Sequence, residues 1–174
     1  MSNILIICGS PRKGNMYTFC DLLQGKLISR EDNSNLLYLS SLNINYCDGC
    51  LLCEDEGICP IDDDLETIKN SMLAADTIIF AVPVYFDNVP GKVKSLIDRS
   101  NLFMNELKGK KCLAALCGQA DIQSWNNCAD IIKNYAEICG MDFGGSVAAQ
   151  ARIPGDIMPE KLNDMVAELI ELLK

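Results

Sequence analysis

Short apolar runs constrain the fold of this chain more than any other feature. "NILIIC" (3–8), "TIIFAV" (77–82) and "KCLAALC" (111–117) are apolar at nearly every position, and "NLLYL" (35–39) is a further run. Strands that are apolar on both faces are typical of parallel sheets that helices cover on both sides. A weaker strand is expected over 142–149. These runs predict a five-stranded parallel sheet.

Amphipathic helices are expected between the strands, because apolar residues recur there three or four positions apart. Strand and helix therefore alternate, which predicts an open doubly wound α/β fold. Ligands bind such sheets beyond the carboxyl ends of the strands. The loops 9–15, 83–90 and 118–124 should form the site. Helices are expected over 16–27, from Asp63 or Asp64 through Met72, and from Pro90 to about 103. Two further helices are expected where apolar residues between Trp125 and Cys139, and between Leu162 and Leu173, share one face.

Length and composition limit the classes of protein. The 174 residues suffice for one domain, predicted over 1–174, with a cysteine-rich insertion at about 46–63. A net charge of −9 argues against a nucleic-acid partner. The chain has no histidine, which excludes Ser-His-Asp and Cys-His hydrolase mechanisms. With no signal-peptide core and no run of membrane-spanning length, a cytoplasmic protein with no membrane partner is expected.

The loop "GSPRKGN" (9–15) follows the first predicted strand. It offers the hydroxyl of Ser10, the guanidinium of Arg12 and the amide of Asn15 beside a helix N-terminus. These groups suit a phosphate. The loop matches neither a Walker sequence nor G-x-G-x-x-G, so an ordinary polar turn remains an alternative.

The loop "PVYFDNVPG" (83–91) places Tyr85 and Phe86 at the predicted ligand edge. Aromatic side chains in such a loop can stack on a planar cofactor. The alternative is that both rings cap the hydrophobic core.

The segment "YCDGCLLCEDEGICPIDDD" (46–64) has the spacing C-x2-C-x2-C-x5-C-P. Three thiols within seven residues, followed by Cys-Pro, favour a 4Fe–4S cluster over structural zinc. Unligated or disulfide-forming thiols remain an alternative. The aspartates at the end of this segment, Asp62, Asp63 and Asp64, are interpreted as the start of a helix. Asp98 and Arg99 are interpreted as a structural ion pair. The candidate ligands are Cys47, Cys50, Cys53 and Cys59, whereas Cys8, Cys20, Cys112, Cys117, Cys128 and Cys139 are expected to be buried.

Three motifs together carry a family resemblance. "GSPRKGN" after the first strand, "PVYF" after the third and "KSLIDR" (94–99) in the next helix resemble the flavodoxin-like NAD(P)H-dependent FMN reductases. With the cysteine motif added, the chain resembles the iron–sulfur flavoproteins of that group. The resemblance covers residues 1 to about 120.

The resemblance implies roles for individual residues. Ser10, Arg12 and Asn15 would hold the FMN phosphate. Met16 stands where the family usually has Thr or Ser, so its backbone N–H, or the hydroxyl of Thr18, would replace a lost donor. The isoalloxazine ring would lie against Pro83, Val84, Tyr85, Phe86, Asp87 and Asn88, with Gly118 and Gln119 near the ribityl and pyrimidine side.

The resemblance also implies a function. The leading hypothesis is a redox protein with FMN and a 4Fe–4S cluster, which passes electrons between a ferredoxin-like carrier and a small-molecule acceptor. An NAD(P)H-dependent FMN or quinone reductase without a cluster is the first alternative, and a non-enzymatic flavodoxin-like electron carrier is the second. No catalytic side chain is required, because the flavin carries the chemistry. A homodimer or homotetramer is expected.

Overall fold

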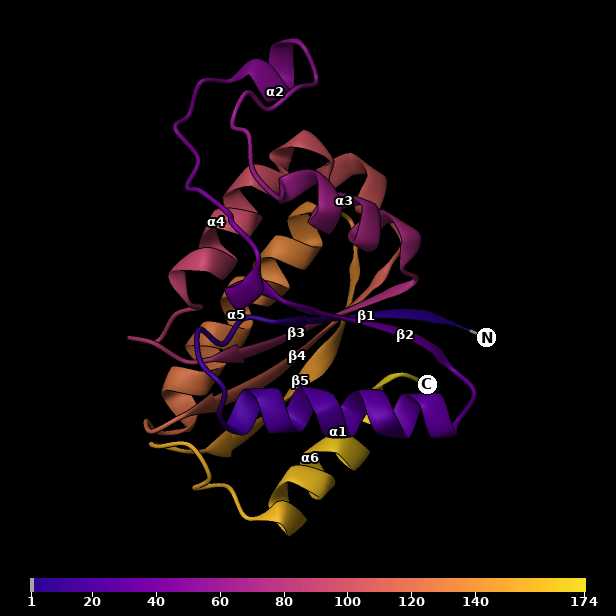
Figure 1. The fold of residues 1–174 in the computed structure, drawn as a ribbon, viewed down its shortest axis with the longest axis vertical. Coiled ribbons are helices and arrows are strands. Elements are labelled where there is room, and N and C mark those ends of the chain that lie inside the picture. The colour runs from indigo at the N-terminus through magenta and orange to yellow at the C-terminus, as the bar shows by residue number, and fades with distance from the viewer. Residues whose placement is uncertain (1) are drawn as a thin grey trace.

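A five-stranded sheet forms the centre of the protein, whose computed structural model describes residues 2–174 (Figure 1). Neighbouring strands run parallel in the order β2-β1-β3-β4-β5. This is the flavodoxin-like order of the doubly wound fold, so the predicted fold class is confirmed. The strands are β1 (Asn3–Cys8), β2 (Asn33–Tyr38), β3 (Thr77–Pro83), β4 (Lys111–Gly118) and β5 (Asp142–Gln150).

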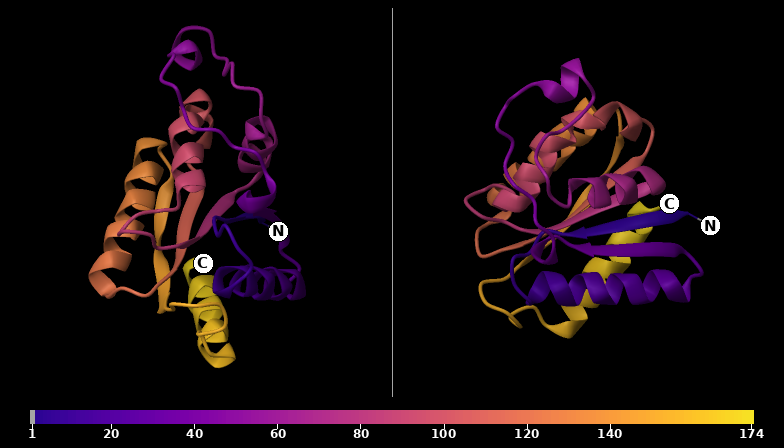
Figure 2. Two further views of the ribbon diagram at one scale, coloured as in Figure 1. Left: turned by 60° about the vertical axis from the view of Figure 1, so that its left-hand side comes forward. Right: turned by 45° about the horizontal axis from the view of Figure 1, so that its top comes forward.

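Helices cover both faces of the sheet. One face packs against α1 and α6, and the other against α3, α4 and α5 (Figures 1 and 2). The helices are α1 (Asn15–Ser29), α2 (Leu52–Asp55), α3 (Leu65–Ala74), α4 (Gly91–Arg99), α5 (Ile122–Ile138) and α6 (Pro159–Leu172). Short 3-10 turns are η1 (Leu39–Ser41), η2 (Ser100–Leu102) and η3 (Met104–Leu107).

The central strands are buried on both faces, as their composition predicts. Side chains of β1 alternate between the two helical layers, so that Ile6 packs with α1 and Ile7 with the opposite layer. All seven residues of β3 are buried. Burial of apolar area on both sides, worth about 25 cal/mol per Å², is what holds this sheet between its helices.

The structure corrects two predicted boundaries. The helix expected from Pro90 to about 103 ends at Arg99, and η2 and η3 follow it. The second strand begins at Asn33 rather than residue 35. Because β2 is an edge strand, polar side chains at its start can face solvent, so no apolar run marks them.

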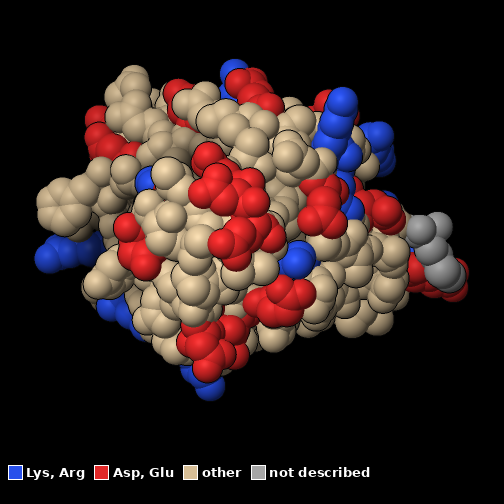
Figure 3. Space-filling model, turned by 90° about the horizontal axis from the view of Figure 1, so that it is seen from above, with Lys and Arg blue, Asp and Glu red and all other residues tan. Residues whose placement is uncertain are grey.

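The segment 46–63, called the cysteine segment below, extends away from the sheet between η1 and α3 (Figure 2). It contains α2, a single turn that the sequence did not predict. Acidic side chains gather on the face of the molecule that carries α2 (Figure 3). Among the helices described in residues 2–174, none has the length and apolar character needed to span a membrane.

Candidate functional site

A cavity of about 230 Å³ lies at the carboxyl edge of the sheet, where the loops after β1, β3, β4 and β5 meet. We call it the edge cavity. It brings together nine of the residues that the sequence singled out. These are Ser10, Arg12, Asn15, Met16, Pro83, Val84, Tyr85, Gly118 and Gln119.

The loop after β1 folds tightly on itself. The buried Ser10 hydroxyl donates to the carbonyl of Arg12 at 2.8 Å, which bends the loop toward α1. The N-terminus of α1 then opens on the edge cavity through Gly14, Asn15 and Met16. A helix N-terminus carries partial positive charge and unpaired N–H groups, so it favours an anion.

Close packing requires glycine at Gly9 and leaves little space for a side chain at Gly118. A Cβ at Gly9 would lie 2.4 Å from Cγ2 of Val93 on α4, too close for any side chain. A Cβ at Gly118 would lie 3.0 Å from Cβ of Val84. The missing side chain at Gly118 therefore lets Val84 pack close to β4, and both residues line the edge cavity.

The loop after β5 supplies a wall that the sequence did not predict. Ala151, Arg152 and Pro154 line the edge cavity. Both polar atoms of the Asn15 amide bind this loop. Nδ2 donates to the carbonyl of Ile153, and Oδ1 accepts from the N–H of Gly155, both at 2.9 Å. The sequence could have predicted this wall, because all parallel strands of a sheet end at the same edge and the loop after the fifth strand must therefore lie there too.

Thus the amide of Asn15 fixes a loop, while Arg152 joins Arg12 as a second cation lining the edge cavity. Two guanidinium groups in one cavity of an acidic protein favour a ligand with more than one negative charge.

Four candidate residues lie outside the lining of the edge cavity. The Thr18 hydroxyl points back to the carbonyl of Gly14, at 3.4 Å. Tyr85 and Asn88 pair through two backbone hydrogen bonds of 2.9 and 3.0 Å, and Phe86 and Asp87 form the tip of this turn. The turn therefore presents only Tyr85 to the cavity.

The tip of this turn has an unusual backbone. Phe86 has φ +49° and Asp87 has φ +60°, which is the left-handed region that side chains disfavour. The Phe86 side chain is fully exposed, whereas the Asp87 carboxylate accepts hydrogen bonds from Ser124 and Asn127 on α5. These two bonds anchor the tip to the helix.

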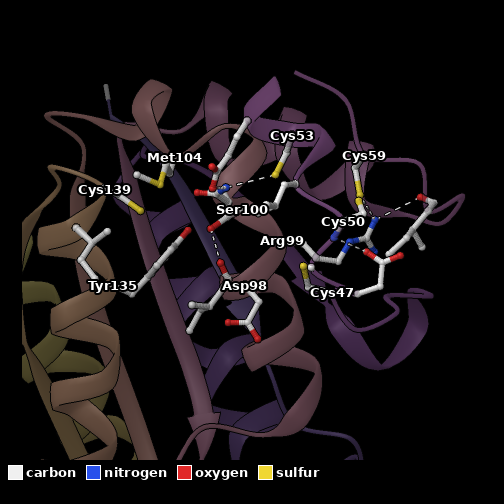
Figure 4. A pocket seen from close by; sticks show the side chains of 18 of the residues that line it. Cys47, Cys50, Cys53, Cys59, Asp98, Arg99, Ser100, Met104, Tyr135 and Cys139 are labelled. Carbon is white, nitrogen blue, oxygen red and sulfur yellow. Dashed lines mark hydrogen bonds between the residues drawn. The ribbon is translucent and has the colours of Figure 1, made fainter. Parts of the chain in front are cut away.

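The four cysteines of the motif line a second cavity, of about 480 Å³, between the cysteine segment, α4, η2 and α5 (Figure 4). We call it the cysteine cavity. Cys47 and Cys50 are exposed, and Cys53 and Cys59 are half-buried. Positive φ values at Gly49, Gly57 and Leu51 let the backbone bend around this cavity. Within residues 2–174, no three potential ligand side chains are gathered as a metal site.

The predicted ion pair between Asp98 and Arg99 is wrong. Arg99 pairs with Asp63, and both side chains are buried, while the exposed Asp98 pairs with Lys94 one helical turn away. Asp63 also accepts from the N–H of Leu65, the first residue of α3, at 3.1 Å. Burial alone would raise the pKa of Asp63, but hydrogen bonds, first that from Arg99, lower it.

The other six cysteines are buried, as predicted. Cys117 lies at the inner wall of the edge cavity, and burial raises the pKa of its thiol to about 12. Burial likewise raises the pKa of Cys112 and Cys128 to about 12. These thiols are therefore protonated at neutral pH and act as small apolar side chains.

The strand order and the helical layers define a flavodoxin-like protein, whose edge cavity is lined by the N-terminus of α1 and by two arginines. A solved structure of oxidised flavodoxin 1 from Bacillus cereus superposes with a TM-score of 0.64, at 15% identity over 99% of this chain and 97% of that one.

The chain belongs to the NADPH-dependent FMN reductase family, whose model matches residues 2–151. It is therefore an FMN-binding flavoprotein and a flavin-dependent oxidoreductase. Two relatives are named iron-sulfur flavoprotein. The one from Methanosarcina thermophila is 34% identical over 78% of this chain and 73% of its own length. The one from Archaeoglobus fulgidus is 37% identical over 90% and 72%.

Proposed function

We propose that this protein transfers electrons through FMN bound in the edge cavity and a 4Fe–4S cluster bound in the cysteine cavity. The observation that carries the proposal is the cysteine cavity itself. Four thiols of one short segment line it, and N–H donors from α4 and η2 contact two of their sulfurs. Thiolates are the preferred ligands of iron–sulfur clusters.

The residues of the edge cavity fit FMN. Arg12, Arg152 and the α1 N-terminus would hold the phosphate dianion, together with the backbone N–H of Met16. Tyr85 would lie against the isoalloxazine ring, and Gly118 and Gln119 would line the ribityl and pyrimidine side. When bound, FMN supplies the exchange of hydride or single electrons.

The residues of the cysteine cavity fit a cluster. Cys47, Cys50, Cys53 and Cys59 would hold it, and a buried N–H of Arg99 that has no partner in residues 2–174 offers a further donor. When bound, a 4Fe–4S cluster supplies one-electron transfer. We therefore propose a ferredoxin-like one-electron donor or NAD(P)H, and a small-molecule acceptor.

The setting of the protein follows from the same features. Six of the ten cysteines are buried thiols that act as small apolar side chains, which suits a reducing compartment such as the cytoplasm. Exposed apolar side chains at the carboxyl edge, among them Ile122 and Ile153, support a homodimer or homotetramer.

An NAD(P)H-dependent FMN or quinone reductase without a cluster is the second candidate. The observation in its favour is that the described residues gather no three ligand side chains at metal-binding geometry. In this case the edge cavity would serve alone, and the cysteine segment would remain without iron.

Iron and FMN content distinguish the two candidates. Protein purified without oxygen should contain FMN and four iron atoms per chain, and each of Cys47→Ser, Cys50→Ser, Cys53→Ser and Cys59→Ser should lower the iron content while FMN remains bound. Cys128→Ser is the matched control, because Cys128 is buried in the core. Full FMN without iron, even after incubation with iron and sulfide, would refute the cluster and leave the reductase.

A further inference from the structure

Arg99 connects α4 to the cysteine segment through several hydrogen bonds. Its side chain is 1% exposed, and the guanidinium donates to the Asp63 carboxylate. It also donates to Sγ of Cys59 at 3.2 Å, to the carbonyl of Ile61 at 3.3 Å and to that of Asn45 at 3.4 Å. One buried cation therefore holds both ends of the cysteine segment.

The guanidinium of Arg99 has one N–H left over. Its Nε is buried and, within residues 2–174, has no hydrogen-bond partner. A buried donor without an acceptor is unfavourable, and more so when the group is charged. Arg99 lines the cysteine cavity, so a ligand with electron-rich acceptor atoms would satisfy this donor there.

Asn101 makes a second, independent contact with a sulfur of the motif. It lies in η2, two residues beyond Arg99, and its Nδ2 donates to Sγ of Cys53 at 3.3 Å (Figure 4). The same amide group also donates to the Glu54 carboxylate at 3.2 Å. Two different elements of the fold thus place N–H donors on two different candidate ligands.

We propose that Arg99 and Asn101 are positioning residues that raise the reduction potential of the cluster. This inference rests on the proposed function. Hydrogen bonds to the ligand sulfurs and the net charge around a cluster are main determinants of its potential. An N–H donor withdraws electron density from a thiolate, and a nearby cation favours the more negative, reduced state.

The charge of the surrounding segment gives Arg99 this role. Asp48, Glu54 and Asp98 also line the cysteine cavity, and their negative charges oppose the arrival of an electron. Arg99 is the cation that lines the same cavity, and its burial reduces screening by water and salt. Loss of its contacts should therefore make the cluster harder to reduce.

The test is a potentiometric titration of the reconstituted protein, followed by electron paramagnetic resonance and absorption. Full-length protein is incubated anaerobically with iron and sulfide, and its iron content and midpoint potential are measured. Asn101→Ala and Arg99→Lys should both lower the midpoint potential relative to wild type. Lysine keeps the charge but loses the planar fork, so the shift isolates the hydrogen bonds.

Asn134→Ala is the matched control. Asn134 is an exposed asparagine that lines the same cavity. The midpoint potential of the Asn134→Ala variant should equal that of wild type. Because Asn101 is exposed too, its substitution tests the proposal even where Arg99→Lys disturbs folding. A purely structural role would change iron content without moving the potential.

The outcomes separate this inference from the proposed function. If wild-type protein takes up no iron, the proposed cluster itself is refuted. If wild type and both variants carry a cluster with one common midpoint potential, the cluster stands and the role of Arg99 and Asn101 is overturned. A shift in Asn134→Ala as large as that in Asn101→Ala would also overturn it.

Discussion

Replacement of Phe86 by glycine should stabilise the protein. Phe86 has φ +49°, and its side chain is fully exposed, so the aromatic ring contributes no burial that offsets its backbone strain. The left-handed conformation costs a non-glycine residue roughly 1–2 kcal/mol. Glycine removes this cost but adds about 0.4–1 kcal/mol of conformational entropy to the unfolded chain.

The difference leaves a net stabilisation of up to about 1.5 kcal/mol for Phe86→Gly. For a chain of this size, this corresponds to a rise in Tm of up to about 6 °C. Thermal unfolding should be measured on FMN-free protein, so that differences in FMN affinity between variants do not enter the comparison.

Two comparison variants separate the effect of backbone strain on Tm from the effect of removing the aromatic ring. Phe86→Ala removes the ring but keeps a side chain at positive φ, so its Tm should stay near that of wild type. Asp87→Gly relieves strain as well but loses the bonds to Ser124 and Asn127, so it should melt below Phe86→Gly. If the Tm of Phe86→Gly is equal to or below that of Phe86→Ala, the claim that the backbone at position 86 is strained is refuted.

Two further predictions concern residues of the edge cavity, and a third concerns the ion pair between Asp63 and Arg99. Arg12→Ala should weaken FMN binding by about 1.5–3 kcal/mol in a flavin titration, and unchanged affinity would remove Arg12 from the site. Tyr85→Phe should keep most of the rate of flavin reduction in stopped-flow measurements, because stacking survives the loss of the hydroxyl. Asp63 has a lowered pKa, so its ion pair with Arg99 stabilises the fold above the ordinary value of about 4, and this contribution is lost as pH falls through the lowered value. Urea unfolding should therefore show a steeper loss of stability below about pH 4 in wild type than in Asp63→Asn, and equal slopes would contradict the argument.

The sheet was predictable because its signal is local. Each central strand is a short run that is apolar on both faces, and segments with helical spacing separate the runs. The parallel type of the sheet and the alternation of strands and helices along the chain therefore follow from the sequence. Parallel strands end at one edge, which also predicted the loops of the edge cavity. The loop 151–155 escaped notice because β5 is partly exposed and its run is weak.

The side-chain partners were not predictable, since they depend on distances that no local pattern encodes. Asp98 precedes Arg99, and adjacency suggested an ion pair, but consecutive helical residues point in different directions. Asp63 instead reaches Arg99 across 36 positions of sequence. The strained tip at Phe86 and Asp87 was equally hidden, because turns of this backbone normally contain glycine or asparagine.

Helix α4 links the two cavities and gives them a common support. It begins directly after the loop that presents Tyr85 to the edge cavity, and it ends at Arg99 beside Cys59. Its nine residues rise about 14 Å. Near its start, Val93 packs against Gly9 so closely that a Cβ at Gly9 would lie 2.4 Å from its Cγ2. The loop after β1 and the cysteine segment are far apart in sequence, yet both contact this one helix, so a displacement of α4 is expected to affect both cavities.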